Sequence, residues 1–285
     1  MMGNLSTTTI PSFFYPLFLN NLLSIYWLIL IAICISIYFF PFLAAISHYG
    51  KNRPQQHQPQ HGASLNTIQS LLTWTVPKSY FLHFYITATL FAILMLSCIS
   101  QAFILIIFFC HSLRRLYESL YISVFSKTAR MHITGYLLGI SFYPLAILTL
   151  YTAHVSSLNE DDEEDDLFYN FIFLLSGLIF LLGSYQQHQA HQILANLRRI
   201  PNLKKSSGNA HQVSTQYSIP YGGWFQYVSC PHFFAEILIY TSFLIKFPSE
   251  RNLQLMWIFV CLNLALTAKT THQWCVQYIY LYLSI

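Results

Sequence analysis

The stretch "FLHFYITATLFAILMLSCISQAFILIIFFCHSLRRLYESLYISVFS", residues 81–126, joins a very long apolar run to a charged end. A helix needs about 20 apolar residues to cross a bilayer, so this run is too long for a single crossing. The polar segment "SCISQ", residues 97–101, is the natural place for a break. The stretch therefore predicts two successive membrane helices, with ionisable side chains at the end of the second.

The rest of the chain has the same character. Of its 285 residues, 55% are hydrophobic, 17% are aromatic and only 8% are charged, which excludes an ordinary soluble domain. Further apolar runs cover residues 22–46, 133–151, 168–185, 233–247 and 253–268. With the first stretch, they predict an all-α integral membrane bundle of about seven transmembrane helices.

We expect a single membrane domain over residues 1–285 and no nucleic-acid partner. The first apolar run is too long for a cleaved signal peptide and lacks a basic start, so we expect it to be retained. The six cysteines form no CxxC pair and no repeated spacing. We interpret them as small buried hydrophobic residues, not as a disulfide or zinc framework.

Charge predicts the orientation in the membrane, because lysines and arginines collect on the cytosolic side. A path of seven helices brings three basic loops to one face, with the N-terminus outside and the C-terminus in the cytosol. The acidic run "EDDEEDD", residues 160–166, and the glycosylation sequon "NLS", residues 4–6, then fall on the other side. The acidic run lacks the spacing of a calcium loop, which favours a solvated charge block. The basic loops contain Lys51, Arg53 and Lys78; Lys127 and Arg130; and Arg198, Arg199, Lys204 and Lys205.

Ionisable residues inside a membrane are costly unless they are paired or face a wet cavity. In "HSLRRLYESLYISVF", residues 111–125, the three- and four-residue spacing puts His111, Arg115 and Glu118 on one helix face. Arg114 also precedes Glu118 by four residues. Two hypotheses fit this pattern: a paired cluster that anchors the helix end, or a functional cluster that faces a cavity.

A second polar group lies in "HQAHQILANLRR", residues 188–199, where His188, His191, Ala195 and Arg198 share one helix face. No further ligand follows these histidines at metal-site spacing, so we expect no metal. The basic end of this segment suits an anionic ligand that enters from the cytosol, because guanidinium groups bind phosphate in a bidentate manner.

Several blocks together resemble the steroid 5-alpha-reductase family, and in particular its polyprenol (polyprenal) reductase branch. They are "VPKSYFLHFY", "HSLRRLYESLYISVFS", "HQILANLRR", "IPYGGWFQYVSCPHFFAE" and "THQW", with "YGK" upstream. The blocks run in order from about residue 49 to residue 274. The family's C-terminal region corresponds to about residues 130–274 of this chain.

This resemblance implies a multi-pass enzyme of the endoplasmic reticulum membrane that uses NADPH. It would reduce the alpha-isoprene double bond of polyprenal, a long-chain polyisoprenoid lipid, in dolichol synthesis for protein N-glycosylation. The alternatives are a steroid enone, as for a 3-oxo-5-alpha-steroid 4-dehydrogenase, and a trans-enoyl thioester. A seven-helix receptor or transporter would have a similar composition but would leave the blocks above unexplained. Protein partners are not indicated.

The resemblance also implies residues that contact the cofactor: Asn196, Arg198, Tyr227, His232 and Glu236. The histidine at 232 stands where an asparagine is often found. Within the glycine-rich turn, residues 222 and 223 would allow the backbone to approach the cofactor closely. The alternative for the glutamate is that it caps the start of its own helix.

Reduction of a conjugated double bond needs a donor that polarises the carbonyl group. The candidates for this catalytic role are Tyr117, Tyr121, His83 and Tyr85, with Glu118 orienting one of them. The sequence does not rank these candidates.

The last residues, 275–285, depart from the family pattern. Relatives continue after the "THQW" block with a tyrosine and a basic tail, whereas this chain has Cys275 and no Lys or Arg after Lys269. A thiol and an uncharged tail cannot replace a phenol and cations beside phosphate. We therefore expect weaker NADPH binding than in relatives, and a catalytically weakened, truncated or alternatively ended form of the family is a further hypothesis.

Overall fold

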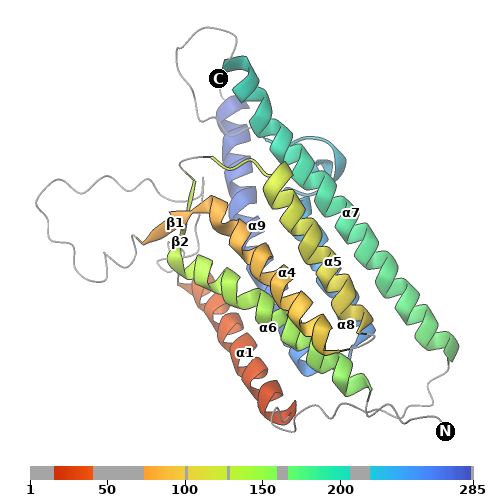
Figure 1. Cartoon of the computed structure of the whole chain (residues 1–285). Helices are drawn as coiled ribbons and strands as arrows, with labels where there is room; N and C mark the ends of the chain where they lie inside the picture. The colour runs from red at the N-terminus through yellow and green to blue at the C-terminus, as the bar shows by residue number, and fades with distance from the viewer. Residues whose placement is uncertain are drawn as a thin grey trace, which may run out of the picture.

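The computed structural model describes residues 16–40, 74–99, 102–126, 129–158, 166–205 and 219–283. Within these ranges the chain forms seven α-helices, which confirms the predicted all-α bundle (Figure 1). They are α1 (Pro16–Phe39), α4 (Phe81–Cys98), α5 (Phe103–Tyr117), α6 (Ile133–Ser157), α7 (Asp166–Lys205), α8 (Pro231–Lys246) and α9 (Arg251–Leu283).

Five of these helices, α1, α4, α6, α7 and α9, are long and apolar enough to cross a membrane. The other two are shorter, with 15 residues in α5 and 16 in α8. The helical path of α5 continues through a π-helical turn, η4 (Glu118–Ile122). The predicted break at "SCISQ" is confirmed, because α4 ends at Cys98 and α5 begins at Phe103. The chain is therefore a membrane protein built as a helical bundle.

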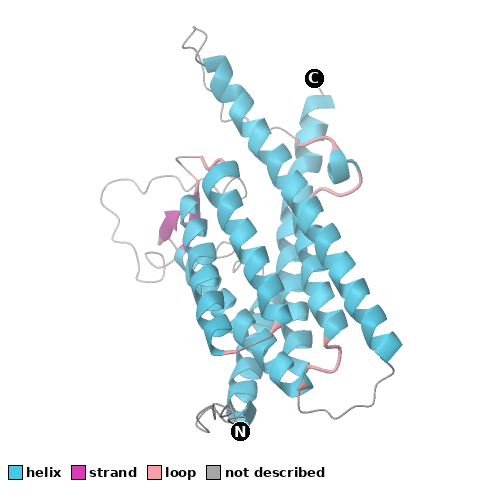
Figure 2. Cartoon of the chain, turned by 45° about the vertical axis from the view of Figure 1, so that its right-hand side comes forward, coloured by secondary structure: helices cyan, strands magenta, loops and turns pink. Residues whose placement is uncertain are grey.

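Successive helices run in alternating directions, so the connections gather at two ends (Figures 1 and 2). One end carries a short antiparallel sheet of β1 (Thr75–Pro77) and β2 (Arg130–His132), in which Thr75 pairs with His132. It also carries two 3₁₀ turns, η3 (Lys78–Tyr80) and η5 (Gly223–Gln226). We call this the sheet end.

The helices α7 and α9 extend well past their apolar runs toward the sheet end (Figure 2). The predicted polar segment at residues 188–199 is therefore helical, and so is the "THQW" block. Helical geometry satisfies the backbone hydrogen bonds of such segments whether lipid or water surrounds them.

Close packing of α7 against α8 brings the polar parts of these two helices together. A Cβ atom built on Gly183 of α7 would lie 2.9 Å from the carbonyl oxygen of Ala235 in α8. Only glycine permits this approach, as small residues do at many membrane helix interfaces. The contact places the turn of α7 that follows Gly183 beside the first turns of α8.

Aromatic side chains fill the core between α1, α6 and α9. Trp27 is fully buried and donates from Nε1 to Thr149 Oγ1 at 3.0 Å. Its ring lies 5.7 Å from Phe142 and 6.0 Å from Phe259, measured between centroids. All six cysteines are free. Three are buried as expected (Cys34, Cys230 and Cys275), but Cys98 and Cys110 are exposed on the bundle, so the expectation of burial is wrong for those two.

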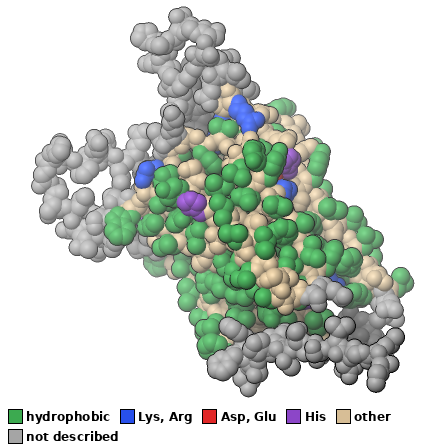
Figure 3. All heavy atoms as spheres, in the orientation of Figure 1, with side chains coloured by type: hydrophobic (Ala, Val, Ile, Leu, Met, Phe, Trp, Pro, Cys, Tyr) green, Lys and Arg blue, Asp and Glu red, His purple; other side chains and the backbone are tan. Residues whose placement is uncertain are grey.

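Hydrophobic side chains cover most of the face seen in Figure 3, with Lys and Arg in small patches. Among the described residues, Lys78, Arg130, Arg198 and Arg199 belong to segments at the sheet end. The opposite end carries Lys246 and Arg251, at the close of α8 and the start of α9. Outside the described residues lie Lys51, Arg53, Lys127, residues 160–165 of the acidic run and the sequon.

Candidate functional site

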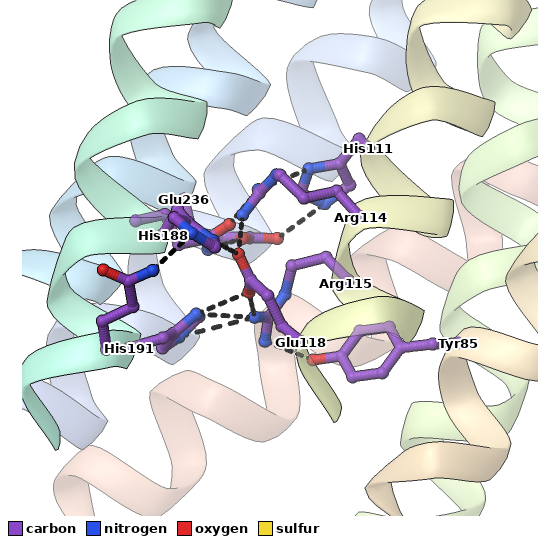
Figure 4. A network of polar contacts seen from close by, with 10 residues as sticks. Tyr85, His111, Arg114, Arg115, Glu118, His188, His191 and Glu236 are labelled. Atoms are coloured by element: carbon purple, nitrogen blue, oxygen red, sulfur yellow. Dashed lines mark hydrogen bonds and ion pairs between the residues drawn. The ribbon is translucent and has the colours of Figure 1, made fainter. Parts of the chain in front are cut away.

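A buried carboxylate is the centre of a polar cluster where α5, α7 and α8 meet (Figure 4). The side chain of Glu118, the first residue of η4, is 0% exposed. Its Oε1 lies 2.5 Å from Arg114 Nη1 and 2.8 Å from His188 Nδ1. Its Oε2 lies 2.5 Å from Arg115 Nη1 and 2.7 Å from His191 Nδ1. Each oxygen therefore has two polar partners, and the two guanidinium groups favour the ionised carboxylate.

The spacing of residues on α5 explains why both arginines reach the same carboxylate. Arg114 and Arg115 precede Glu118 by four and three residues, which are the neighbours of a residue on a helix surface. The π turn then closes through a hydrogen bond from Ser123 N to Glu118 O at 2.7 Å. The predicted grouping of Arg114, Arg115 and Glu118 is confirmed, and α7 supplies histidines that the sequence had shown only as a separate group.

A second carboxylate, Glu236 of α8, joins the same cluster. It accepts a hydrogen bond from Gln187 Nε2, and its Oε1 lies 3.6 Å from His111 Nε2. Gln187 Oε1 in turn accepts from Arg114 Nη2 at 2.5 Å. A continuous polar path therefore links α5, α7 and α8 (Figure 4).

The alternative in which Glu236 caps its own helix is wrong. The residue before α8 is Cys230, no side chain caps the helix, and its first turn contains no acidic residue. Glu236 lies in the second turn, where its carboxylate faces other helices and not the backbone amides of its own helix.

Tyrosines extend the cluster toward the middle of the bundle. Arg115 donates from Nη2 to the Tyr85 hydroxyl at 2.5 Å, and its guanidinium lies 4.8 Å from the centre of that ring. The ring of Tyr143 lies 5.6 Å from that of Tyr85. Tyr240 is also buried and lies one turn beyond Glu236 on α8. The sequence pattern had not singled out Gln187, Tyr143 or Tyr240, although Tyr240 follows Glu236 at the four-residue spacing of one helix face.

The charges in this cluster balance. It holds two guanidinium groups and two carboxylates, so it has no net charge when its histidines are neutral. Four buried polar atoms of the cluster nevertheless have no hydrogen-bond partner among the described residues: His111 Nε2, Arg114 Nε, His232 Nδ1 and Tyr240 Oη. The first of these still lies 3.6 Å from Glu236 Oε1. A neutral polar group with both donors and acceptors, such as a carboxamide, fits these atoms better than an anion does.

Three of the predicted catalytic residues lie apart from Glu118. Tyr117 and Tyr121 are 53% and 69% exposed, with their ring centroids 5.2 Å apart. His83 is half-buried in α4, and its Nδ1 lies 3.0 Å from the Tyr136 hydroxyl. Their catalytic role stays a prediction.

The predicted cofactor residues form two groups. His232 and Glu236 lie at the cluster, with the His232 ring 5.8 Å from that of His191. The other three, Asn196, Arg198 and Tyr227, are exposed at the sheet end. Arg198 donates to the backbone carbonyl of Val124. Between Arg198 and Tyr227 in the sequence, Gly222 and Gly223 have φ angles of 97° and 52°, which favour glycine.

The described part of the chain contains no group of three or more His, Cys, Asp or Glu side chains placed to hold a metal ion. The histidines beside Glu118 instead make hydrogen bonds to its carboxylate. The Nδ1 atoms of both histidines are therefore already bonded to a side chain of the protein.

Comparison with known proteins extends these observations. A family model described as 3-oxo-5-alpha-steroid 4-dehydrogenase matches residues 129–282. "Polyprenal reductase" of Saccharomyces cerevisiae is 34% identical over 217 residues, which cover 76% of this chain and 74% of that protein. "Polyprenal reductase 1" of Arabidopsis thaliana is 29% identical, covering 72% and 77%. "Polyprenal reductase" of Homo sapiens is 31% identical, covering 70% and 71%. The chain therefore belongs to the steroid 5-alpha-reductase family of membrane oxidoreductases, in its polyprenal reductase branch.

Proposed function

We propose that this protein is an NADPH-dependent polyprenal reductase. It reduces the alpha-isoprene double bond of polyprenal, a step of dolichol synthesis for protein N-glycosylation, in the endoplasmic reticulum membrane. The observation that carries the proposal is the buried, charge-balanced cluster around Glu118 and Glu236, whose unpartnered polar atoms lie inside an apolar membrane bundle. The names of the similar proteins support the substrate class.

The cofactor is proposed to bind from the sheet end. Glu236 and His232 would hold the carboxamide of the nicotinamide, because a carboxylate accepts and an imidazole can donate or accept. The exposed Asn196, Arg198 and Tyr227 would contact the nucleotide part, with arginine suited to phosphate. A reduced nicotinamide, when bound, supplies a hydride.

The protein's own groups would prepare the substrate for this hydride. Addition to a carbon-carbon double bond is favourable when a conjugated carbonyl takes up the electron pair, which favours an aldehyde over an allylic alcohol as substrate. Donors placed at the carbonyl oxygen stabilise the developing negative charge in a dry site. The Arg115 guanidinium and the Tyr85 hydroxyl that it contacts give such a site a positive character.

The apolar helices would hold the polyisoprenoid chain. Side chains such as Phe108 and Phe243 form a buried apolar core next to the polar cluster, with their ring centroids 5.9 Å apart. A lipid that lies among the helices would therefore meet the cluster with its polar end only.

A steroid enone is the second candidate substrate, because the matching family is described by its 3-oxo-5-alpha-steroid 4-dehydrogenase activity. A steroid 3-ketone with a conjugated double bond presents the same reacting group as polyprenal. The two substrates differ in the apolar part, which is a rigid ring system in one and a flexible chain in the other.

The test uses the full chain purified in lipid nanodiscs. Polyprenal, a steroid enone and a trans-enoyl-CoA are each incubated with NADPH or NADH, and the products are identified by mass spectrometry. The proposal expects the aldehyde with a saturated alpha-isoprene unit from polyprenal and NADPH, with deuterium from labelled NADPH at the carbon β to the carbonyl. Faster reduction of the steroid enone would favour the second candidate. Failure to bind NADPH, measured separately by fluorescence, would reject both.

A further inference from the structure

The hydroxyl of Tyr240 is a buried polar group that makes no hydrogen bond to any described residue. The side chain is 1% exposed, and its oxygen has no hydrogen-bond partner in the described ranges. Six other buried side-chain atoms, among them the hydroxyls of Ser119 and Ser184, also have no partner among the described residues, but Tyr240 is the only tyrosine in this set. The half-buried Tyr26 hydroxyl pairs with Ser141 Oγ at 2.9 Å, and the buried Trp27 donates to Thr149. Because buried polar groups are almost always paired, an unpaired phenol points to a partner supplied from outside the chain.

The position of Tyr240 relates it to the cluster. It follows Glu236 by four residues, so both side chains leave the same face of α8. Its hydroxyl is close enough to Glu236, Arg115 and Tyr85 to interact with each of them electrostatically. Its ring packs against Phe142 and Phe243, each with centroids 6.0 Å away. The phenol therefore lies at the boundary between the charged cluster and the apolar core.

We propose that Tyr240 is a catalytic residue whose hydroxyl donates a hydrogen bond to the carbonyl oxygen of the conjugated substrate. This inference rests on the proposed function. As the hydride forms a bond to the carbon β to the carbonyl, the electron pair of the double bond moves toward the carbonyl and negative charge develops on its oxygen. The proton that completes the reduction goes to the α carbon and comes ultimately from water. The phenol keeps its proton and stabilises the charge by hydrogen bonding.

The position of Tyr240, one turn of α8 beyond Glu236, suits this role. If Glu236 holds the nicotinamide, the substrate's reactive end must lie beside it, and the next turn of α8 carries Tyr240. A lipid aldehyde brings one polar atom, an acceptor, into this position, and a phenol O–H is a matching donor. The oxygen of Tyr85 already accepts from Arg115, which fixes that side chain within the protein.

The test substitutes Tyr240→Phe in the full chain. We expect kcat with polyprenal to fall by about 100- to 1,000-fold, as when one donor is removed from an oxyanion site. NADPH affinity should stay unchanged, and thermal stability should not fall, because the hydroxyl makes no hydrogen bond to any described residue. Tyr26→Phe is the matched control, since it removes a half-buried hydroxyl on α1 that is paired with Ser141: stability should fall and kcat should not.

A spectroscopic measurement provides a readout that does not depend on turnover. The protein is saturated with NADP⁺, which cannot reduce, and with an enal labelled with ¹³C at the carbonyl. A hydrogen bond from Tyr240 should lower the carbonyl stretching frequency in the infrared difference spectrum, and Tyr240→Phe should abolish that shift.

Three results would overturn the inference: unchanged kcat in Tyr240→Phe, a parallel loss of NADPH affinity, or loss of the carbonyl shift in Tyr121→Phe with its retention in Tyr240→Phe. The proposed function is judged first, on the unsubstituted protein. If that protein reduces a steroid enone and not polyprenal, the same variants and labelled carbonyl are examined with the enone. If it reduces neither, the proposed function and the inference both fail.

Discussion

Two polar clusters lie between helices of this membrane bundle, and they differ in whether all their buried polar atoms are hydrogen-bonded. At the end opposite the sheet, Ser24 donates to Asn252 Oδ1 at 2.6 Å, Arg251 donates to Ser24 Oγ at 2.8 Å, and Asn252 Nδ2 lies 3.2 Å from Asn20 Oδ1. No buried side-chain nitrogen or oxygen of these four lacks a partner. The cluster around Glu118 and Glu236 is larger, carries four charges and leaves four buried polar atoms without a hydrogen bond to any residue that the structure describes.

The difference bears on which cluster joins helices and which one we propose as a binding site. Polar groups inside a membrane are costly, so a group that only joins two helices should have all its hydrogen bonds satisfied by those helices. The contact between α1 and α9 meets that condition. The cluster between α5, α7 and α8 does not, which supports our proposal that a ligand completes it.

Substitution of Glu118 by alanine should have the largest effect. It leaves Arg114 and Arg115 buried without their carboxylate, and removing one partner of a buried pair typically costs about 3 to 5 kcal/mol. We expect a large fall in thermal stability in detergent. A double variant with Arg114→Ala should recover part of that loss, because it removes one unpaired cation. A fully stable Glu118→Ala variant would contradict the pairing.

Glu236→Gln tests whether the carboxylate of Glu236 binds the cofactor. Gln187 can still donate to the amide oxygen, so the fold should survive. A lost charge-assisted hydrogen bond of about 1.5 to 3 kcal/mol to the cofactor should weaken NADPH affinity by roughly 10- to 150-fold. Fluorescence titration with NADPH measures this. Unchanged affinity in a folded variant would remove Glu236 from the cofactor site.

Substitution of His232, whose Nδ1 has no hydrogen-bond partner among the described residues, should have a smaller effect on NADPH affinity. His232→Leu removes both ring nitrogens and should weaken NADPH affinity by roughly fivefold to tenfold, the value of one ordinary hydrogen bond. His232→Asn keeps a donor and an acceptor and should retain most of the affinity. Equal losses in the two variants would show that shape at this position matters more than hydrogen bonding.

Asn252→Ala, at the complete cluster, should have the smallest effect and only on stability. Loss of its hydrogen bonds to Ser24 and Asn20 should lower the free energy of unfolding by about 1 to 2 kcal/mol. NADPH affinity and kcat should not change. A change in either would mean that the contact between α1 and α9 communicates with the site.

Much of the fold could be predicted because it depends on local features. Apolar runs predicted the helices, and "SCISQ" predicted the break before α5. The lengths of α7 and α9 could not be predicted from hydrophobicity, because a helix can continue beyond the membrane with polar side chains. The three- and four-residue spacing predicted one face with His111, Arg115 and Glu118, and it placed Arg114 four residues before Glu118; both arginines do contact that carboxylate.

The sequence predicted the parts of the site separately but not their contacts with one another. The sequence showed a cluster near Glu118, a pair of histidines at 188 and 191, and an isolated Glu236. It also left open the possibility that Glu236 capped its own helix. The four-residue spacing from Glu236 could have drawn attention to Tyr240, but a tyrosine at that spacing in an apolar helix is common and gives no sign of being unpaired.

The sequence alone therefore determined the helices, the membrane setting and the family, because hydrophobicity, periodicity and ordered blocks are properties of neighbouring residues. Only the tertiary structure decided that His188 and His191 contact a carboxylate 70 and 73 residues earlier in the chain. It also decided that Gln187 connects Arg114 to Glu236 and that the Tyr240 hydroxyl has no hydrogen-bond partner within the described part of the chain. The physical reason is that a hydrogen bond between helices depends on their separation and rotation, which packing contacts such as Gly183 against Ala235 set far from the residues that bond.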